Sequence, residues 1–182
     1  MEEMIKKLFF EESLRQWHFE DILKEAKISR ERANHFLKIL LKQKLITRTK
    51  PKGKMPYHTA NTDSCKFRGE KRIYGLALLE KAGLFEHLNS LTGIKTAILF
   101  GSFSRGDWNK SSDIDLFVYG NSKDFEKGKM ERKIKKEIQL FSYSQTKQIK
   151  KELEPKLIPN IAKGFSIKGD LDPFKIEIDD QK

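Results

Sequence analysis

Two apolar runs on either side of a short polar segment constrain the fold of this chain more than any other feature. Residues 96–100 and 112–118 have the composition of buried strands, and the second run is apolar apart from Asp113 and Asp115. Because side chains alternate along a strand, carboxylates two residues apart project from the same face. Such a pair beside an apolar strand is costly unless a cation neutralises it. Oxygen ligands of this kind favour Mg²⁺, or Mn²⁺, with triphosphate oxygens completing the coordination.

The polar segment that follows the first run has the features of a phosphate-binding turn. Gly101 carries no Cβ, so the backbone can approach a phosphate closely, and Ser102 adds a hydroxyl and a backbone N–H. The polar Ser102 and Ser104 indicate that a helix begins here, and a helix N-terminus favours anions. Arg105 is a candidate to pair with a phosphate, or alternatively with an aspartate as a structural lock. The expected ligand is ATP or another nucleoside triphosphate, bound with the metal ion.

A Gly-Ser pair followed after ten residues by Asp-Ile-Asp resembles the DNA polymerase β-type nucleotidyltransferase superfamily. The arrangement is most similar to the minimal nucleotidyltransferases of archaea and bacteria, whose typical motif G-S-x-x-R-G-x-x-x-x-x-S-D-I-D-L is matched in register over residues 101–116. The resemblance extends more loosely over residues 92–170. It implies that Asp113 and Asp115 are catalytic metal ligands and that a nucleoside monophosphate is transferred to a hydroxyl. The implied acceptor is a protein, a small molecule or a nucleic-acid end.

The strand that follows departs from the pattern of this superfamily. Active members typically carry a third carboxylate there, but in the strand candidate 137–142 Gln139 stands at the expected position. Glutamine lacks the charge that a second metal ion needs. Glu137 lies two residues earlier on the same face and is the candidate third catalytic residue, although its place at the start of the strand also fits solvent exposure. Two functions stay open: a nucleotidyltransferase, or a catalytically weak regulator that uses this domain to sense nucleotide or to dimerise.

The first third of the chain has the pattern of three helices and a hairpin. Apolar residues recur at helical spacing over residues 2–12 and 19–26, and Ser29 is placed to cap a third helix with an apolar stripe. Strand-like residues then flank a Pro/Gly tip at residues 50–54. This order resembles the winged helix-turn-helix domains of bacterial and archaeal regulators. We therefore expect residues 1–62 to form such a domain.

The charge distribution favours double-stranded DNA as the partner of this domain. The chain has a formal net charge of +11, and no acidic residue stands between Glu31 and Asp63. The exposed side of the third helix can enter a major groove, and the hairpin can reach phosphates or the minor groove. The candidate DNA-binding residues are Arg32, Asn34, His35, Lys38, Lys42, Arg48, Lys50, Lys52 and Lys54. The alternative is a solvated basic face on a helical protein-interaction module.

The remaining segments complete an α+β fold. Residues 63–91 are compatible with a connecting helix, which Gly75 and Gly83 weaken, so a kink or two pieces is expected. This helix is expected to mediate a homodimer or to pack against the second domain. Residues 92–182 are expected to form a small nucleotidyltransferase-type mixed sheet with flanking helices, including a final helix over 144–161.

Three further expectations concern the loop after the Gly-Ser turn and the end of the chain. Trp108 lies in this loop, where it could stack on a base or, more ordinarily, anchor the loop. Residues 165–167 and 174–178 are short strand candidates.

Several classes of protein are excluded by composition. No run approaches the roughly 20 apolar residues that span a bilayer, and the N-terminus lacks the pattern of a signal peptide. Cys65 is the single cysteine, which excludes an internal disulfide and a multi-cysteine zinc site. We therefore expect a cytoplasmic protein with no membrane partner.

Overall fold

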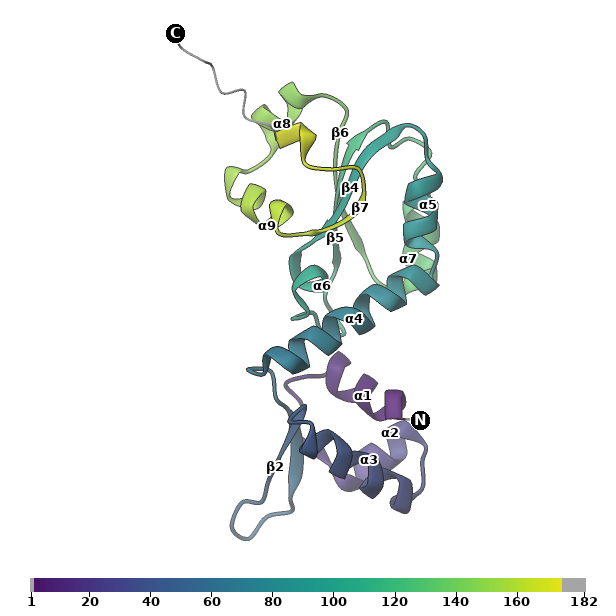
Figure 1. Cartoon of the computed structure of the whole chain (residues 1–182). Coiled ribbons are helices and arrows are strands. Elements are labelled where there is room, and N and C mark those ends of the chain that lie inside the picture. Colours follow the sequence, from purple (N-terminus) through teal and green to yellow (C-terminus); the bar gives the residue numbers. More distant parts are fainter. Residues whose placement is uncertain (1, 175–182) are drawn as a thin grey trace. The chain divides into compact units, whose positions relative to one another are not determined.

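The computed structural model describes residues 2–174, and its fold is α+β. The chain divides into two compact units (Figure 1). The first unit consists of Met1–Ile73 together with Gly106–Ser111, and the second of Tyr74–Arg105 together with Ser112–Lys182. A loop from the middle of the sequence therefore belongs to the N-terminal unit.

The first unit contains helices α1 to α3, the first half of the helix Cys65–Lys81 and a small antiparallel sheet. The expected helices and hairpin are confirmed, and the hairpin strand β3 also pairs with a two-residue strand, β1, which is too short to be recognised from a pattern. Ser29 caps the third helix as expected, since its Oγ accepts from the backbone N–H of Arg32 at 3.4 Å. The elements are α1 (Glu2–Glu11), β1 (Trp17–His18), α2 (Phe19–Ala26), α3 (Arg30–Lys42), β2 (Ile46–Thr49) and β3 (Tyr57–Ala60).

The core of the first unit follows from the apolar stripes of its helices. On α3 the buried residues are Ala33, Leu37 and Leu40, at the spacing of one helix face. They leave the polar side of α3 in solvent. Phe9 and Trp17 are buried in the same unit and make an edge-to-face contact, with ring centroids 6.3 Å apart.

The connecting segment consists of two helices, α4 (Cys65–Lys81) and α5 (Leu84–Ser90). The break falls at Gly83, which has φ +82, a conformation that favours glycine. Gly75 lies inside α4 without ending it. The expectation that the connecting segment forms two helices is confirmed. Of the two glycines, Gly83 interrupts the helix and Gly75 does not.

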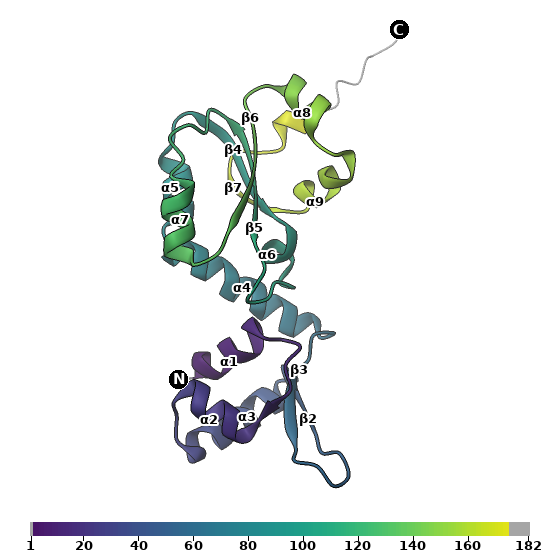
Figure 2. The same ribbon diagram turned by 180° about the vertical axis from the view of Figure 1, so that it is seen from behind.

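The second unit is built on a mixed four-stranded sheet in the order β6-β5-β4-β7. Strand β5 is parallel to β6 and antiparallel to β4, and β4 is also antiparallel to β7. Figures 1 and 2 show α5 and α7 on one face of this sheet and α8 and α9 on the other. The strands are β4 (Ile94–Phe100), β5 (Ile114–Gly120), β6 (Ile138–Tyr143) and β7 (Phe165–Lys168). The helices that follow β4 are α6 (Gly101–Arg105), α7 (Lys127–Ile134), α8 (Thr146–Glu152) and α9 (Ile158–Ala162).

The expectation of one final helix over 144–161 is wrong. Helix α8 ends before Leu153, and a 3₁₀ turn over Pro155–Leu157 separates it from α9. Proline has no backbone N–H and clashes with the preceding turn, so Pro155 begins a new turn and does not continue α8. The strand expected at 165–167 is confirmed as β7. Of the strand expected at 174–178, Phe174 lies in a 3₁₀ turn and the rest falls outside the described residues.

Candidate functional site

The Gly-Ser turn lies directly beside Asp115. Strand β4 ends at Phe100, which is paired with Asp115 of β5, and α6 begins at the next residue, Gly101. Gly101 has φ +68, and a Cβ at this position would overlap the carboxylate of Asp115. Glycine is therefore required here twice, once by its backbone conformation and once by the close approach of an acidic side chain.

Asp115 is held in an environment that disfavours its charge. Burial raises the pKa of the Asp115 carboxyl, and the nearby charge of Asp113 raises it further. Two groups act in the opposite direction: the positive charge of Arg105, and the backbone N–H of Ser102, which donates to the carboxylate. Because the pKa is raised despite these two groups, a bound cation would relieve an electrostatic cost that is present in the folded chain.

Gln139 lies beside the two aspartates, at the position where the resemblance led us to expect a third carboxylate. Strands β5 and β6 are parallel with Asp115 paired to Gln139, so the amide lies beside the acidic pair. Its Nε2 donates to Oδ2 of Asp113 at 3.0 Å. The side chain beside the two aspartates is therefore a neutral donor, which adds no negative charge to the pair.

Glu137 does not join this pair in the structure. Its side chain is exposed, it lines a shallow hollow with residues of α7, and its backbone carbonyl accepts from the N–H of Ile114 at 2.9 Å. Within residues 2–174 no group of three or more His, Cys, Asp or Glu side chains is close enough to hold a metal ion. A catalytic role for Glu137 stays a prediction that the geometry does not favour.

Ser104 and Arg105, the other predicted nucleotide contacts, have different surroundings. Ser104 is buried, and its Oγ donates to the backbone carbonyl of Gly101 at 3.0 Å, so this hydroxyl already stabilises the turn. Arg105 is exposed at the end of α6 and acts electrostatically on Asp115. Arg105 is therefore the better placed of the two to meet an anion beside the aspartates.

Lys136 is a residue of this neighbourhood that the sequence pattern did not single out. It is half-buried, its Nζ donates to the backbone carbonyl of Ser112 at 3.2 Å, and its ammonium lies 5.5 Å from the ring centre of Phe103. The contact with Ser112 places a positive charge next to Asp113 in the chain. No periodicity marks Lys136, because it belongs to the turn between α7 and β6.

Trp108 is a loop anchor. It is fully buried in the first unit, and its Nε1 donates to the backbone carbonyl of Lys71 at 3.3 Å. A role in stacking on a base is therefore wrong, because the ring has no exposed face to offer.

The oxygen ligands of the site fit one divalent ion. Mg²⁺ in proteins is typically held by one or two carboxylates, with water and substrate phosphate oxygens filling the octahedron. Asp113 and Asp115 supply two carboxylates, and burial, together with the nearby charge of Asp113, raises the pKa of Asp115. Gln139 offers no third negative charge, so the described residues fit one such ion better than two.

Replacing Gly101 with alanine should destabilise the fold and disturb Asp115. Gly53 is the matched control, because it has φ +70 in the hairpin tip but nothing within 4 Å of an added Cβ. Both alanines incur the left-handed strain of about 1–2 kcal/mol. The alanine at 101 also overlaps the carboxylate, which adds about 1–3 kcal/mol. Urea denaturation measures the difference, and equal losses for the two variants would contradict the close contact.

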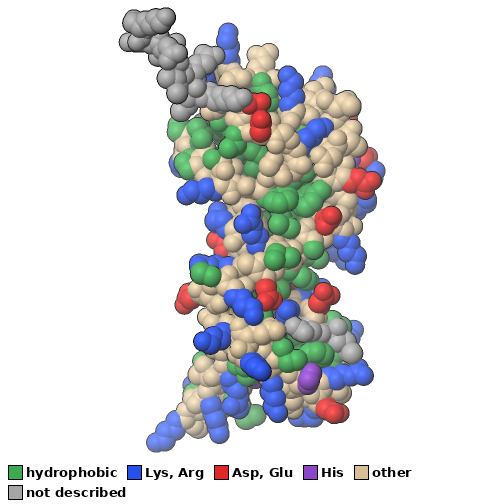
Figure 3. All heavy atoms as spheres, in the orientation of Figure 1, with side chains coloured by type: hydrophobic (Ala, Val, Ile, Leu, Met, Phe, Trp, Pro, Cys, Tyr) green, Lys and Arg blue, Asp and Glu red, His purple; other side chains and the backbone are tan. Residues whose placement is uncertain are grey.

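The predicted DNA-binding residues all lie on the surface of the first unit. The residues of α3 occupy its polar side, opposite the buried stripe, and Figure 3 shows Lys and Arg side chains gathered over the hairpin at the lower left. The acidic Glu31 lines a shallow hollow together with Arg32, Asn34, His35 and Lys38 on the polar side of α3. The exposed set is Arg32, Asn34, His35, Lys38, Lys42, Arg48, Lys50, Lys52 and Lys54.

Comparison with known families relates the second unit to transferases. The model described as "Nucleotidyltransferase domain" matches residues 82–177, slightly more than half of the chain. The match contains the Gly-Ser turn, both aspartates and Gln139. No curated protein matches the chain. Among residues 2–174, no helix is long and apolar enough to cross a lipid bilayer.

Proposed function

Because this chain belongs to the nucleotidyltransferase domain family, we propose that it binds a nucleoside triphosphate with Mg²⁺ and transfers the nucleoside monophosphate to a hydroxyl acceptor. Domains of this family generally use a nucleoside triphosphate and a divalent metal ion. The observation that carries the proposal is the contact between the Gly101 turn and Asp115, with Asp113 two residues away.

Each residue of the site has a defined part in this proposal. Asp113 and Asp115 hold the ion, Mg²⁺ or Mn²⁺, which when bound neutralises charge that develops on the phosphoryl group being transferred. The backbone of the Gly101–Ser102 turn contacts the phosphates. The missing Cβ of Gly101 leaves room for the Asp115 carboxylate beside this turn. The guanidinium of Arg105 pairs with a phosphate oxygen.

A second candidate function is favoured by the hydrogen bond from Gln139 to Asp113. Binding of one metal ion and the nucleotide needs only the two aspartates, whereas activation of an acceptor hydroxyl in two-metal enzymes needs a second ion. The chain would then bind nucleotide as a signal and catalyse transfer weakly or not at all.

The two candidates are distinguished by one set of incubations. Full-length protein is mixed with Mg²⁺, each nucleoside triphosphate labelled at the α-phosphate, and a total-protein fraction, a total-RNA fraction or small polyols as acceptors. A transferase releases pyrophosphate and labels one acceptor, and Asp113→Ala abolishes both signals. Binding of Mg²⁺ and ATP without release supports the nucleotide sensor. Absence of nucleotide binding would contradict both candidates.

For the first unit, we propose double-stranded DNA as the partner, bound by a winged helix-turn-helix domain within residues 1–62. Helix α2, a short turn and α3 precede the β2–β3 hairpin, an order that supports recognition by α3 and phosphate contact by the hairpin. The residues between Glu31 and Asp63 carry positive charge without negative charge, and such surfaces bind phosphates with a strong dependence on salt.

Replacing Lys50, Lys52 and Lys54 together with glutamine should weaken DNA binding and lower its dependence on salt. The three side chains are exposed in the hairpin tip, so the fold should be unaffected. Each lost phosphate contact reduces the slope of log K against log salt by about 0.9, so the slope should fall by roughly 2 to 3. Fluorescence anisotropy with a labelled duplex at several salt concentrations measures both quantities.

The matched control removes the same charge from the other unit. Lys147, Lys150 and Lys151 are exposed on α8, and their replacement with glutamine changes the net charge equally. This variant should keep the wild-type slope. If both triple variants lose affinity equally, binding follows net charge alone. The hairpin would then have no specific part in it.

A further inference from the structure

A basic surface adjoins the acidic pair of the second unit at the end of α7. From Lys127 to Lys136 the sequence has six basic residues and one acidic residue, Glu131. The three exposed basic residues nearest the end of the helix form what we call the α7 basic surface. The functions proposed above give this surface no role. Its members are Arg132, Lys133 and Lys135.

The charges of the α7 basic surface are open to a partner. Two other basic side chains of the segment are paired with carboxylates: Nζ of Lys127 lies 3.5 Å from Glu131, and Nζ of Lys129 lies 2.6 Å from Glu126. Among residues 2–174, no ion pair engages the three members of the surface. Exposed cations that no close carboxylate neutralises attract an anionic partner.

The two residues that follow this surface contact both neighbours of Asp113. Nζ of Lys136 donates to the backbone carbonyl of Ser112 at 3.2 Å. The backbone carbonyl of Glu137 accepts from the N–H of Ile114 at 2.9 Å. The end of α7 is therefore attached to the segment that carries the first aspartate, and a partner on the α7 basic surface lies next to the acidic pair.

The backbone of Lys135 favours a role for its side chain. Lys135 ends α7 with φ +59, a left-handed conformation that glycine adopts without strain and that other residues avoid. Glycine is the residue most often found at such a helix end. An exposed lysine in this conformation is better explained by its charge than by the fold.

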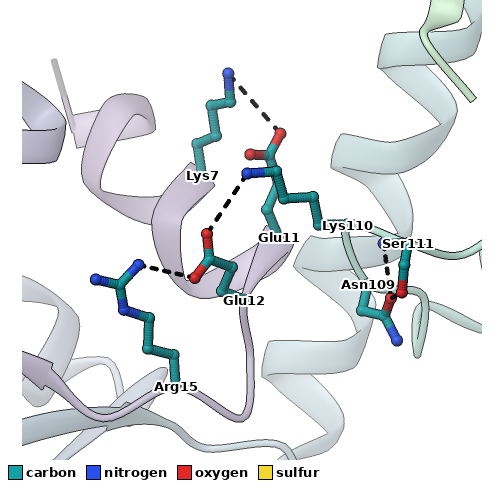
Figure 4. Close-up of polar contacts among 7 residues, drawn as sticks. All are labelled: Lys7, Glu11, Glu12, Arg15, Asn109, Lys110 and Ser111. Carbon is teal, nitrogen blue, oxygen red and sulfur yellow. Dashed lines mark hydrogen bonds and ion pairs between the residues drawn. The ribbon is translucent and has the colours of Figure 1, made fainter.

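The loop on the other side of the acidic pair uses its polar groups within the first unit. Nζ of Lys110 lies 3.8 Å from a carboxylate oxygen of Glu12 (Figure 4). The side-chain oxygen of Asn109 accepts from the backbone N–H and the hydroxyl of Ser111, at 2.9 and 2.7 Å. With Arg105 assigned to a phosphate of the nucleotide, the α7 side is left to receive the acceptor.

These features favour a nucleic-acid strand as the acceptor. A strand is a row of phosphates that ends in a hydroxyl, so several exposed cations can hold the row while its end reaches the acidic pair. The hollow beside the end of α7 is shallow and includes Arg132 and Lys135, a shape that fits a chain lying on the surface better than an enclosed small molecule. A cationic small molecule would be repelled by the same charges.

We infer that the acceptor is a nucleic-acid strand held by the α7 basic surface, and that its terminal hydroxyl receives the nucleoside monophosphate. This inference rests on the function proposed for the second unit. The hydroxyl oxygen forms a bond to the α-phosphorus, and the bond from that phosphorus to the oxygen bridging to the β-phosphate breaks. Pyrophosphate leaves with the electron pair, and the hydroxyl proton passes to water.

Binding of a strand tests the surface without any transfer. Fluorescence anisotropy with a labelled single-stranded RNA or DNA uses full-length protein that carries the triple glutamine substitution of the hairpin, so that the hairpin does not contribute. Replacing Arg132, Lys133 and Lys135 with glutamine in this protein should lower the slope of log K against log salt by about 2, since each phosphate contact with a single strand contributes about 0.7. The affinity near about 0.1 M salt should fall about 100-fold.

The triple glutamine variant of α8 is the matched control for charge. It removes three positive charges from the same unit, and Figures 1 and 2 show α8 at the end of the sheet away from α6. Strand binding by this variant should keep both the affinity and the slope.

Transfer tests the acceptor itself. Wild-type protein is incubated with α-labelled ATP, Mg²⁺ and a strand that is free or blocked at its terminal hydroxyls. The label should join the free strand and not the blocked one. The glutamine variant of the α7 basic surface should reduce labelling at least about tenfold while its affinity for ATP with Mg²⁺ stays that of wild type.

Replacing Lys135 with glycine separates charge from fold. Glycine relieves the left-handed strain, so the variant should unfold at a higher urea concentration and yet bind the strand about fivefold more weakly near about 0.1 M salt. Lys27→Gly is the control, because Lys27 ends α2 with φ +51 and is also exposed. This control should gain stability and keep its affinity for the strand. Unchanged strand binding by Lys135→Gly would contradict the role of its charge.

The outcomes distinguish this inference from the function on which it rests. If a protein or a polyol is labelled and no strand is, nucleotidyl transfer stands and the acceptor inference is overturned. Equal loss of strand binding in the α7 and α8 variants would also overturn it, because binding then follows net charge. If the strand binds through the α7 basic surface but no acceptor is labelled and no pyrophosphate is released, transfer itself fails, and the acceptor role fails with it.

Discussion

Replacing Asp115 with asparagine should lower the affinity for Mg²⁺ and ATP by at least about 100-fold, because even the outer partners of a metal ligand account for roughly 10–100-fold in metal affinity. Asparagine has nearly the same shape and can still accept from the N–H of Ser102. What is lost is the negative charge beside Asp113. Calorimetric titration with ATP at fixed Mg²⁺ measures the change.

The same substitution should stabilise the protein in the absence of metal and nucleotide. Burial and Asp113 raise the pKa of Asp115 in the folded state, so ionisation of this group costs free energy of folding. The protonated Asp115 contributes its full share of stability at a pH below the pKa that this carboxyl has in the unfolded chain. That contribution is lost as the pH rises through the higher pKa that it has in the folded chain. The asparagine variant should therefore unfold at higher urea concentration than wild type near pH 7. The difference should shrink as the pH falls toward the ordinary value of 3.8.

The two results together identify the role of Asp115. A side chain that serves only the fold would lower stability when replaced, and metal affinity would then fall through unfolding. Lower stability of the asparagine variant near pH 7, or unchanged affinity for Mg²⁺ and ATP, would contradict the assignment. Glu126→Gln is a suitable control, because Glu126 is an exposed carboxylate whose pKa its contact with Lys129 lowers.

Much of the fold follows from local pattern, because most elements are long and amphipathic. The stripe of α3 and the cap at Ser29 are visible as spacing and residue type, so both are predicted from sequence. Pairing between distant segments is less visible. β1 has two residues and exists because β3 supplies its partner. Trp108 packs in the first unit through a hydrogen bond to Lys71, which lies 37 positions earlier in the sequence. Tertiary contacts of this kind leave no periodic signal.

The candidate site likewise has features that the sequence predicts and features that it does not. Asp113, Asp115 and Gly101 belong to one continuous motif, so their proximity is predicted by spacing. Gln139 is expected at the third position from the sequence, and the register of the parallel pair β5–β6 places it beside Asp115. The pattern could not show that its amide donates a hydrogen bond to Asp113. Ser104 shows the opposite case, since its hydroxyl points back to the turn although its polarity suggested a ligand contact.

Replacing Gln139 with glutamate should convert a site for one metal ion into a site for two. The new carboxylate is close in shape to the amide, but it removes the donor 3.0 Å from Oδ2 of Asp113 and places a third negative charge there. Without metal the variant should be less stable than wild type. With Mg²⁺ and ATP, calorimetry should show two ions bound, and pyrophosphate release should rise on the order of 100-fold, the equivalent of about 2.7 kcal/mol.

Two further variants separate charge from position. Gln139→Asn keeps the neutral amide and should show neither the second ion nor the gain in rate. Glu137→Gln tests whether the exposed Glu137 supplies a carboxylate that the structure does not place beside Asp113. If Glu137→Gln abolishes wild-type pyrophosphate release, the third ligand is Glu137, and Gln139 is then a spectator. If Glu137→Gln has no effect on pyrophosphate release and Gln139→Glu increases it, then the neutral amide of Gln139, in the place of a ligand for a second ion, is the cause of weak transfer.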